Sequence, residues 1–266
     1  MLKKRFADNT SRDSVSTRLR RQRFTILVKL LDYFEGPVRI LDVGGRPQFW
    51  ESMTADRILG KSIHVTLLNL EAYPVCAPGF TAVVGDGRKM PQYLDGQFDI
   101  VFSNSTIEHA GTRADQLQMA NEMRRVGKAY CIQTPSRSFP IEPHFLFPFF
   151  QFLPISVRTR LVNTFDLGWY KRVRDKREAE ALVRSISLLS RRDVERLFPD
   201  ATIYEERYAG AVKSYVAYRG ASHSGVPAAS TRIDAPDLEF AGYQLQAARE
   251  DDLKMTSPRS GPARAG

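Results

Sequence analysis

Cysteine is scarce in this chain, and long apolar runs are missing. Two cysteines occur among 266 residues, Cys76 and Cys131, too few for a disulfide framework or a cysteine metal cluster. No segment approaches the roughly 20 apolar residues that span a bilayer, and the N-terminus lacks the apolar core of a secretion signal. We therefore expect a soluble, cytoplasmic protein.

Acidic residues are outnumbered by basic ones. The chain has 39 Lys and Arg against 30 Asp and Glu, which gives a formal net charge of +9. This excess indicates an anionic partner, whether nucleic acid, a membrane surface or an acidic substrate. Because many basic residues crowd the N-terminus and no basic-aromatic recognition module accompanies them, we do not expect nucleic-acid binding.

Length and composition predict one catalytic domain between two flexible ends. A chain of 266 residues can bury one sizeable core, with material left for an insertion or a tail. We expect a flexible basic N-terminus at residues 1–14, a domain at 15–219 with an insertion at 135–190, and a disordered tail at 221–266. The tail is rich in Ser, Gly, Pro, Ala and charges, and it cannot bury enough surface to order itself.

Strand-like segments alternate with segments long enough to cross over. Such alternation predicts an α/β fold built on a parallel sheet. The last two predicted strands are joined by a turn at Gly210. The predicted strands are 38–43, 63–69, 80–84, 98–103, 128–134, 201–207 and 212–219.

Helix signals complete this pattern. Apolar residues at helical spacing predict an amphipathic helix over 15–34, which Gly36-Pro37 would end. Thr112 and Ser190 each precede an aspartate by three residues, a pattern that predicts a helix N-terminus at both places. The first of these helices would stop at Gly127, and a further helix is expected at 175–187.

The stretch Arg39-Ile-Leu-Asp-Val-Gly-Gly-Arg46 is typical of the start of a cofactor site. A buried strand would run into Asp42, and Gly44 and Gly45 would permit a tight turn that lets backbone amides approach a ligand. The alternative is that Asp42 merely caps the helix that follows.

Three later motifs narrow the choice of cofactor. They are Val65-Thr-Leu-Leu-Asn-Leu-Glu71, Val84-Gly-Asp-Gly87 and Phe98-Asp-Ile-Val-Phe-Ser-Asn-Ser-Thr-Ile-Glu-His109. With the glycine turn they resemble the successive motifs of class I S-adenosylmethionine-dependent methyltransferases, in particular the methyltransferase type 11 group. The resemblance implies S-adenosylmethionine as the cofactor. It also implies a Rossmann-like, seven-stranded, mostly parallel sheet with an antiparallel C-terminal hairpin and helices on both faces.

The glycine turn departs from the common pattern of this family. Arg46 and Gln48 stand where the second and third glycines would be. Their presence weighs against a dinucleotide, whose pyrophosphate requires close backbone approach. We hypothesise that Arg46 pairs with the methionine carboxylate of the cofactor, and an exposed Arg46 without that role is the alternative.

The resemblance assigns the nucleoside end of the cofactor to the next two motifs. Glu71 would accept hydrogen bonds from the ribose hydroxyls, with Asn69 as the rival for this position by strand register. Asp86, followed by Gly87, matches the family residue that accepts from the adenine amino group, although Asp and Gly also favour turns for structural reasons. Ser103 would close the cofactor site at the end of its strand.

The methyl acceptor is expected at the carboxyl edge of the sheet, after strand 98–103. Glu108-His109 resembles a Glu-His pair of small-molecule methyltransferases, and His109 would remove a proton from the acceptor. The alternative is that His109 caps or packs beside the next helix. Some relatives that methylate polyprenyl quinone precursors bind a metal here, but Thr106 stands where they carry a further acidic group, so we expect no metal.

The segment 135–170 is rich in proline and aromatic residues. Glu142 and His144 lie within it, and as a lid over the site it would supply a second acid/base pair. A cap packed on the core is an equally good interpretation. The third is an apolar surface at 145–160 that contacts a membrane or holds a lipid-linked acceptor.

Three functions remain open from the sequence. The first is methyl transfer from S-adenosylmethionine to a small-molecule, saccharide or lipid-linked acceptor, catalysed mostly by positioning. The second is a nicotinamide- or nucleotide-binding Rossmann enzyme. The third is a non-catalytic, membrane-peripheral module that keeps the fold.

Overall fold

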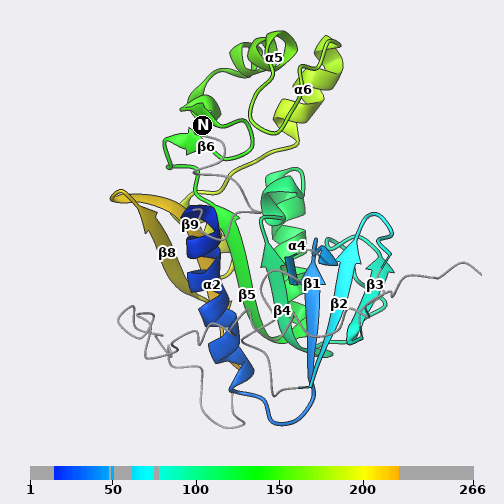
Figure 1. The fold of residues 1–266 in the computed structure, drawn as a ribbon. Coiled ribbons are helices and arrows are strands. Elements are labelled where there is room, and N and C mark those ends of the chain that lie inside the picture. Colours follow the sequence, from blue (N-terminus) through cyan, green and yellow to red (C-terminus); the bar gives the residue numbers. More distant parts are fainter. Residues whose placement is uncertain (1–14, 48, 51–61, 75–77, 222–266) are drawn as a thin grey trace, which may run out of the picture. The chain divides into compact units, whose positions relative to one another are not determined.

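A seven-stranded sheet forms the centre of the molecule. The computed structural model describes residues 15–47, 49–50, 62–74 and 78–221. The predictions for residues 1–14, Gln48, Cys76 and 222–266 lie outside these described residues. Along the sheet the strand order is β3-β2-β1-β4-β5-β9-β8 (Figure 1). The strands are β1 (Val38–Val43), β2 (Ile63–Asn69), β3 (Phe80–Val84), β4 (Phe98–Asn104), β5 (Gly127–Pro135), β8 (Thr202–Tyr208) and β9 (Ala211–Arg219).

The direction of the strands confirms the predicted fold class. β1 pairs in parallel with β2 and β4, and β3 and β5 continue the parallel arrangement on either side. β9 pairs antiparallel with both β5 and β8. Gly210, with φ +81°, lies in the tight turn between β8 and β9, where a left-handed backbone favours glycine. All seven predicted strands lie within one residue of the observed bounds.

Helices cover both faces of the sheet. One face packs against α4 (Arg113–Val126) and α7 (Arg191–Leu197), and its core includes Leu41, Val101 and Tyr130. On the opposite face α2 (Val15–Leu31) contacts β4 and β5, and Phe49 and Trp50 pack against Phe102 (Figure 1). Since successive strand residues point to opposite faces, the near-continuous burial of β1 and β4 requires a cover on each side.

Two of the predicted helix starts are confirmed by their side chains. Thr112 and Ser190 each form a capping box with the aspartate three residues later, Asp115 and Asp193. The end predicted for the first helix, in contrast, is wrong by three residues. α2 (Val15–Leu31) stops before Phe34, because the amides of residues 32–34 bond three residues back and so form turns in place of helix.

Residues 141–186 form a cap with an apolar core of its own. It contains β6 (Ile141–Glu142), β7 (Phe147–Pro148), η2 (Phe150–Phe152), α5 (Ile155–Thr164) and α6 (Lys176–Arg184) (Figure 1). Its two ends meet, since Ser136 and Leu189 form a parallel bridge just beyond β5. The cap is therefore held at the carboxyl end of β5.

The apolar surface predicted at 145–160 is corrected in part by this core. Phe145 and Phe150 are buried inside the cap, so they cannot face a membrane. Phe149 and Phe152 are 58% and 53% exposed. Each helix in the described part of the chain is too short or too polar to cross a bilayer.

Candidate functional site

The turn after β1 accepts no side chain at either glycine. Gly44 has φ +79°, and its amide donates to the carbonyl of Leu68 at 2.8 Å. A Cβ at Gly44 would overlap Oγ1 of Thr106, and a Cβ at Gly45 would overlap the carboxylate of Asp42. Packing against Thr106 and Asp42 therefore excludes a side chain at both positions.

Asp42 lies buried behind this turn. Its Oδ2 accepts a hydrogen bond of 2.7 Å from Nε1 of Trp50, while Oδ1 is buried without a partner among the described residues. Burial raises the pKa of Asp42 to about 7. Neither oxygen accepts from a described backbone amide, so the simple helix-cap alternative gains no support from this structure.

Two further predicted residues meet at the turn. Asn69 ends β2, and its Nδ2 donates to the carbonyl of Gly45 at 3.2 Å. Ser103 is fully buried in β4 and donates to the carbonyl of Val43 at 2.9 Å, so it holds the turn from within the sheet. Glu71 lies exposed in the loop after β2. Of the two rivals for the ribose, Asn69 is thus the one that contacts the turn.

Asp86 forms an ion pair that the sequence analysis missed. The guanidinium of Arg88 binds both oxygens of Asp86 at 2.7–3.0 Å, and this pairing lowers the pKa of the carboxyl. The amide of Gly85 donates to the carbonyl of Asn69, which brings the turn to the end of β2. A Cβ at Gly87 would lie 2.6 Å from Val43, so this turn also packs against the end of β1.

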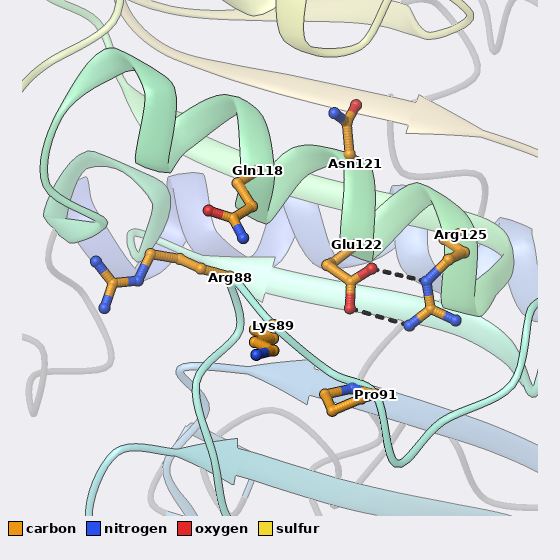
Figure 2. Close-up of a pocket in the computed structure, with 7 residues that line it drawn as sticks. All are labelled: Arg88, Lys89, Pro91, Gln118, Asn121, Glu122 and Arg125. Carbon is orange, nitrogen blue, oxygen red and sulfur yellow. Dashed lines mark hydrogen bonds and ion pairs between the residues drawn. The ribbon is translucent and has the colours of Figure 1, made fainter.

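Arg88 also lines a surface hollow of about 440 Å³ between the loop after β3 and α4. Figure 2 shows its lining, in which the carboxylate of Glu122 faces the guanidinium of Arg125. Those two groups bond at 2.7 and 2.9 Å, and Arg88 is held by Asp86. Arg88, Glu122 and Arg125 are thus already paired. For this reason we regard the hollow as a weaker candidate for a ligand site than the carboxyl edge of the sheet.

Arg46, the substitute for a family glycine, is exposed. Its guanidinium lies 5.6 Å from the centroid of the Tyr73 ring, within the range of a cation–π contact. Tyr73 belongs to the loop after β2, so Arg46 is directed across the edge of the sheet. Its pairing with a carboxylate stays a prediction.

Glu108 is buried on the short helix η1 (Ile107–His109), which follows β4. Its Oε2 accepts from Oγ1 of Thr134 at 3.0 Å, while Oε1 has no partner among the described residues. Burial raises the pKa of Glu108 to about 7. A neutral form of this carboxyl group is accordingly present near neutral pH.

The three residues predicted to act on the acceptor form one hydrogen-bonded cluster. Nε2 of His109 lies 3.1 Å from Nε2 of His144, and Nδ1 of His144 lies 2.7 Å from Oε1 of Glu142. Glu142 is buried, and its Oε2 also accepts from the amides of His144 and Phe145. Residues 35 positions apart are thus brought together by the cap.

The two imidazoles of this cluster differ in basicity. Burial, helped by the neighbouring His144, lowers the pKa of His109 to about 4. Burial would also lower the pKa of His144, but the hydrogen bond and charge of Glu142 outweigh it and raise this pKa. Glu142 therefore favours the protonated form of His144, whereas burial favours the neutral form of His109.

The same cluster brings together groups of the kind that bind metals. Glu108, His109 and His144 each offer a ligand atom, and these atoms lie within 4.8 Å of one another. The expectation of no metal rested on Thr106. The structure places Thr106 against Gly44, where it supports the glycine turn. That this cluster binds no metal stays a prediction.

Comparison with known proteins identifies the central region. Residues 43–130 match the family model of a methyltransferase domain. This range begins at the end of β1 and reaches β5, so it contains Gly44, Asn69, Asp86 and His109. No protein with a curated description is significantly similar to the chain.

One solved structure shares the fold of this chain, and another is reported beside it. The CurJ carbon methyltransferase has a TM-score of 0.51 and 11% identity, over 79% of this chain and 56% of its own. A SAM-dependent methyltransferase from Aquifex aeolicus has a TM-score of 0.43 and 14% identity, over 77% and 93%. At 11% identity the CurJ likeness shows a common fold, and the chain spans little more than half of that protein. The chain therefore carries a methyltransferase domain on a class I methyltransferase fold, for which S-adenosylmethionine is the cofactor.

Proposed function

We propose that this protein transfers the methyl group of S-adenosylmethionine to a small acceptor bound between the carboxyl edge of the sheet and the cap. The observation that carries the proposal is the domain match over residues 43–130, which contains both the glycine turn and His109. The cap supports it as well, because it brings His144 to 3.1 Å from His109 at that edge. Ligands of open parallel sheets gather at the carboxyl ends of the strands.

The residues of the turn fit the cofactor. Gly44 and Gly45 allow the tight turn at the end of β1, packed against Thr106 and Asp42, and Asp42 Oδ1 is a buried acceptor without a partner among the described residues. Asn69 lies beside this turn, and Asp86 belongs to a turn that packs against the end of β1. Their oxygens already accept from the amide of Leu70 and from Arg88, so a ribose and an adenine would use the remaining lone pairs. When bound, S-adenosylmethionine supplies a methyl group on a sulfonium that is already a good leaving group.

The chain would then contribute position and proton handling. A neutral imidazole is available at His109 above pH 4 or so, the value to which burial brings its pKa. Glu142 fixes the ring of His144 through two bonds, one to its backbone and one to Nδ1. In our proposal His109 orients the acceptor hydroxyl or amine. The His109–His144 pair takes up the proton that this group loses, with His144 neutral before the step, and Glu142 favours the uptake because it raises the pKa of His144.

The loop that carries His144 is fixed within the cap. Gly168 lies against the backbone of His144 and Phe145 with φ +54°, which leaves no room for a side chain there. This close approach locks the loop that carries His144 onto the rest of the cap. A small-molecule acceptor, or the small reactive end of a saccharide or lipid-linked one, suits such a site.

A screen for methyl transfer tests the proposal. The full chain is incubated with methyl-labelled S-adenosylmethionine and pools of hydroxyl, amine and carboxylate acceptors, and S-adenosylhomocysteine is quantified. We expect its formation to depend on one acceptor class. Cofactor binding without product in any pool would favour the non-catalytic module, and binding of a nicotinamide dinucleotide in place of S-adenosylhomocysteine would favour the dehydrogenase-type alternative.

A further inference from the structure

The cap contains a cavity of about 250 Å³ that the proposed methyl transfer leaves without an occupant. Its lining includes the apolar residues Phe145 and Val183 and the charged residues Arg137, Arg158 and Glu142, and polar atoms make up most of the exposed lining. Complete sites for drug-sized ligands occupy about 300–1,000 Å³. A cavity of this size therefore suits one group of a ligand rather than a whole large molecule.

Positive charge in this cavity is only partly compensated. Arg113, which also lines it, is bound by Gln116 and lies 3.3 Å from Asp193. The guanidinium groups of Arg137 and Arg158 have no carboxylate partner within 4.0 Å among the described residues. Two arginines without an ion-pair partner thus line the cavity together with one carboxylate, Glu142, and this excess of positive charge favours an anion.

Arg158 shows this lack of a partner most clearly. Its Nε is buried and makes no hydrogen bond within the described chain. Burial lowers the pKa of Arg158, and the positive charges of Arg184 and Arg137 lower it further, against an opposing effect of Glu142.

The cavity adjoins the proposed reaction centre. Glu142 lines it, and the same carboxylate bonds His144, which faces His109. Ser187 and Leu188 line it from the other side, and the amide of Ser187 donates to the carbonyl of Glu108 at 2.8 Å. Only the side chain of Glu142 would therefore separate a ligand group in the cavity from the imidazole of His144.

We propose that the methyl acceptor carries an oxyanion group, a carboxylate or a phosphate, and that Arg137 and Arg158 bind this group in the cap cavity. This inference rests on the proposed methyl transfer. The planar guanidinium matches both oxyanions in a two-bond geometry, and apolar lining residues such as Phe145 and Val183 would contact the carbon skeleton next to the anion. The acceptor atom would then extend past Glu142 toward His109.

The binding of small anions tests this inference directly. Inorganic phosphate, benzoate and the neutral analogue benzamide are titrated into the full chain saturated with S-adenosylhomocysteine, at constant ionic strength. We expect saturable binding of phosphate or of benzoate, and weaker binding of benzamide than of benzoate. Tighter phosphate binding would indicate a phosphate ester as the acceptor, and tighter benzoate binding a carboxylic acid.

Three variants locate the bound anion. Arg137→Gln and Arg158→Gln should each weaken it about tenfold or more, because each removes a charge-assisted hydrogen bond. Arg160→Gln is the matched control, since Arg160 is exposed on α5 and does not line the cavity. Its affinity should stay within about twofold of the wild type.

The inference is overturned if neither anion binds saturably, if benzamide binds as well as benzoate while phosphate does not bind, or if the control weakens as much as the cavity variants. Should Arg158→Gln fail to fold, the exposed Arg137 still decides the question. Failure of the wild type to bind S-adenosylhomocysteine would count against the proposed function alone. The anion titrations are then repeated without it, and their result still decides the cavity.

Discussion

Replacing Gly44 with alanine separates the cofactor turn from ordinary backbone strain. Gly44 has φ +79°, a conformation that costs an L-residue about 1–2 kcal/mol. Its new Cβ would also overlap the side chain of Thr106, so Thr106 or the turn must move. Gly210→Ala is the matched control, because Gly210 has φ +81° but no atom within 4 Å of its would-be Cβ.

The two variants should lose similar amounts of unfolding free energy through strain, with an added loss for Gly44→Ala from the overlap. We expect the affinity for S-adenosylhomocysteine to fall at least about tenfold, or about 1.4 kcal/mol, in Gly44→Ala only. Urea unfolding measures the first quantity, and calorimetric titration the second. Equal affinity in both variants, or an equal loss in both, would refute the assignment of the cofactor to this turn.

Three further changes probe other parts of the molecule. His109→Ala should lower the rate of methyl transfer about 100-fold or more if the imidazole handles the acceptor proton. The control His64→Ala, at an exposed histidine on β2, should leave the rate within about twofold. Similar rates for both variants would exclude the proposed role of His109. Asp42, whose pKa is raised from 3.8 to about 7, contributes stability that is present below pH 4 and lost as the pH rises through 7, by at most about 4 kcal/mol. Urea unfolding between pH 4 and 8 should therefore show a flatter dependence of the unfolding free energy on pH for Asp42→Asn than for the wild type. Parallel curves would contradict the raised pKa. Peripheral membrane contact through 145–160 predicts that liposome co-sedimentation of the full chain is lost in Phe149→Ser with Phe152→Ser, and no sedimentation of the wild type would rule this contact out.

The sequence alone located the sheet because its local signals agree with its tertiary structure. Short apolar segments bounded by polar or glycine residues predict strands from the local pattern alone, and the same segments are strands in the fold. The capping boxes at Thr112 and Ser190 are equally local, since each is completed within four residues. The end of α2 was missed because turns at residues 32–34 continue the apolar spacing without continuing the helix.

The site was less accessible to sequence reasoning because its contacts are distant along the chain. His109 and His144 are 35 residues apart, and only the path of the cap brings them to 3.1 Å. The bond from Trp50 to Asp42 depends on how the chain returns to the sheet after the glycine turn. Arg88 is the exception. It lies two residues after Asp86, close enough for the pair to have been anticipated from the sequence.

The uncompensated arginines of the cap had no detectable signature in the sequence. Arg137 follows β5 and Arg158 lies on α5, and each is one of many basic residues in a chain with a net charge of +9. What distinguishes them is that they line one cavity and form no ion pair with a described carboxylate. That property belongs to the packing of the cap, which composition does not report.

Calorimetric titration of the full chain with S-adenosylhomocysteine, beside a parallel titration with nicotinamide adenine dinucleotide, tests the central claim most directly. The account predicts saturable binding of the first ligand at one site per chain, weakened in Gly44→Ala, and no saturable binding of the second. Binding of the dinucleotide alone, or of neither ligand, would contradict it.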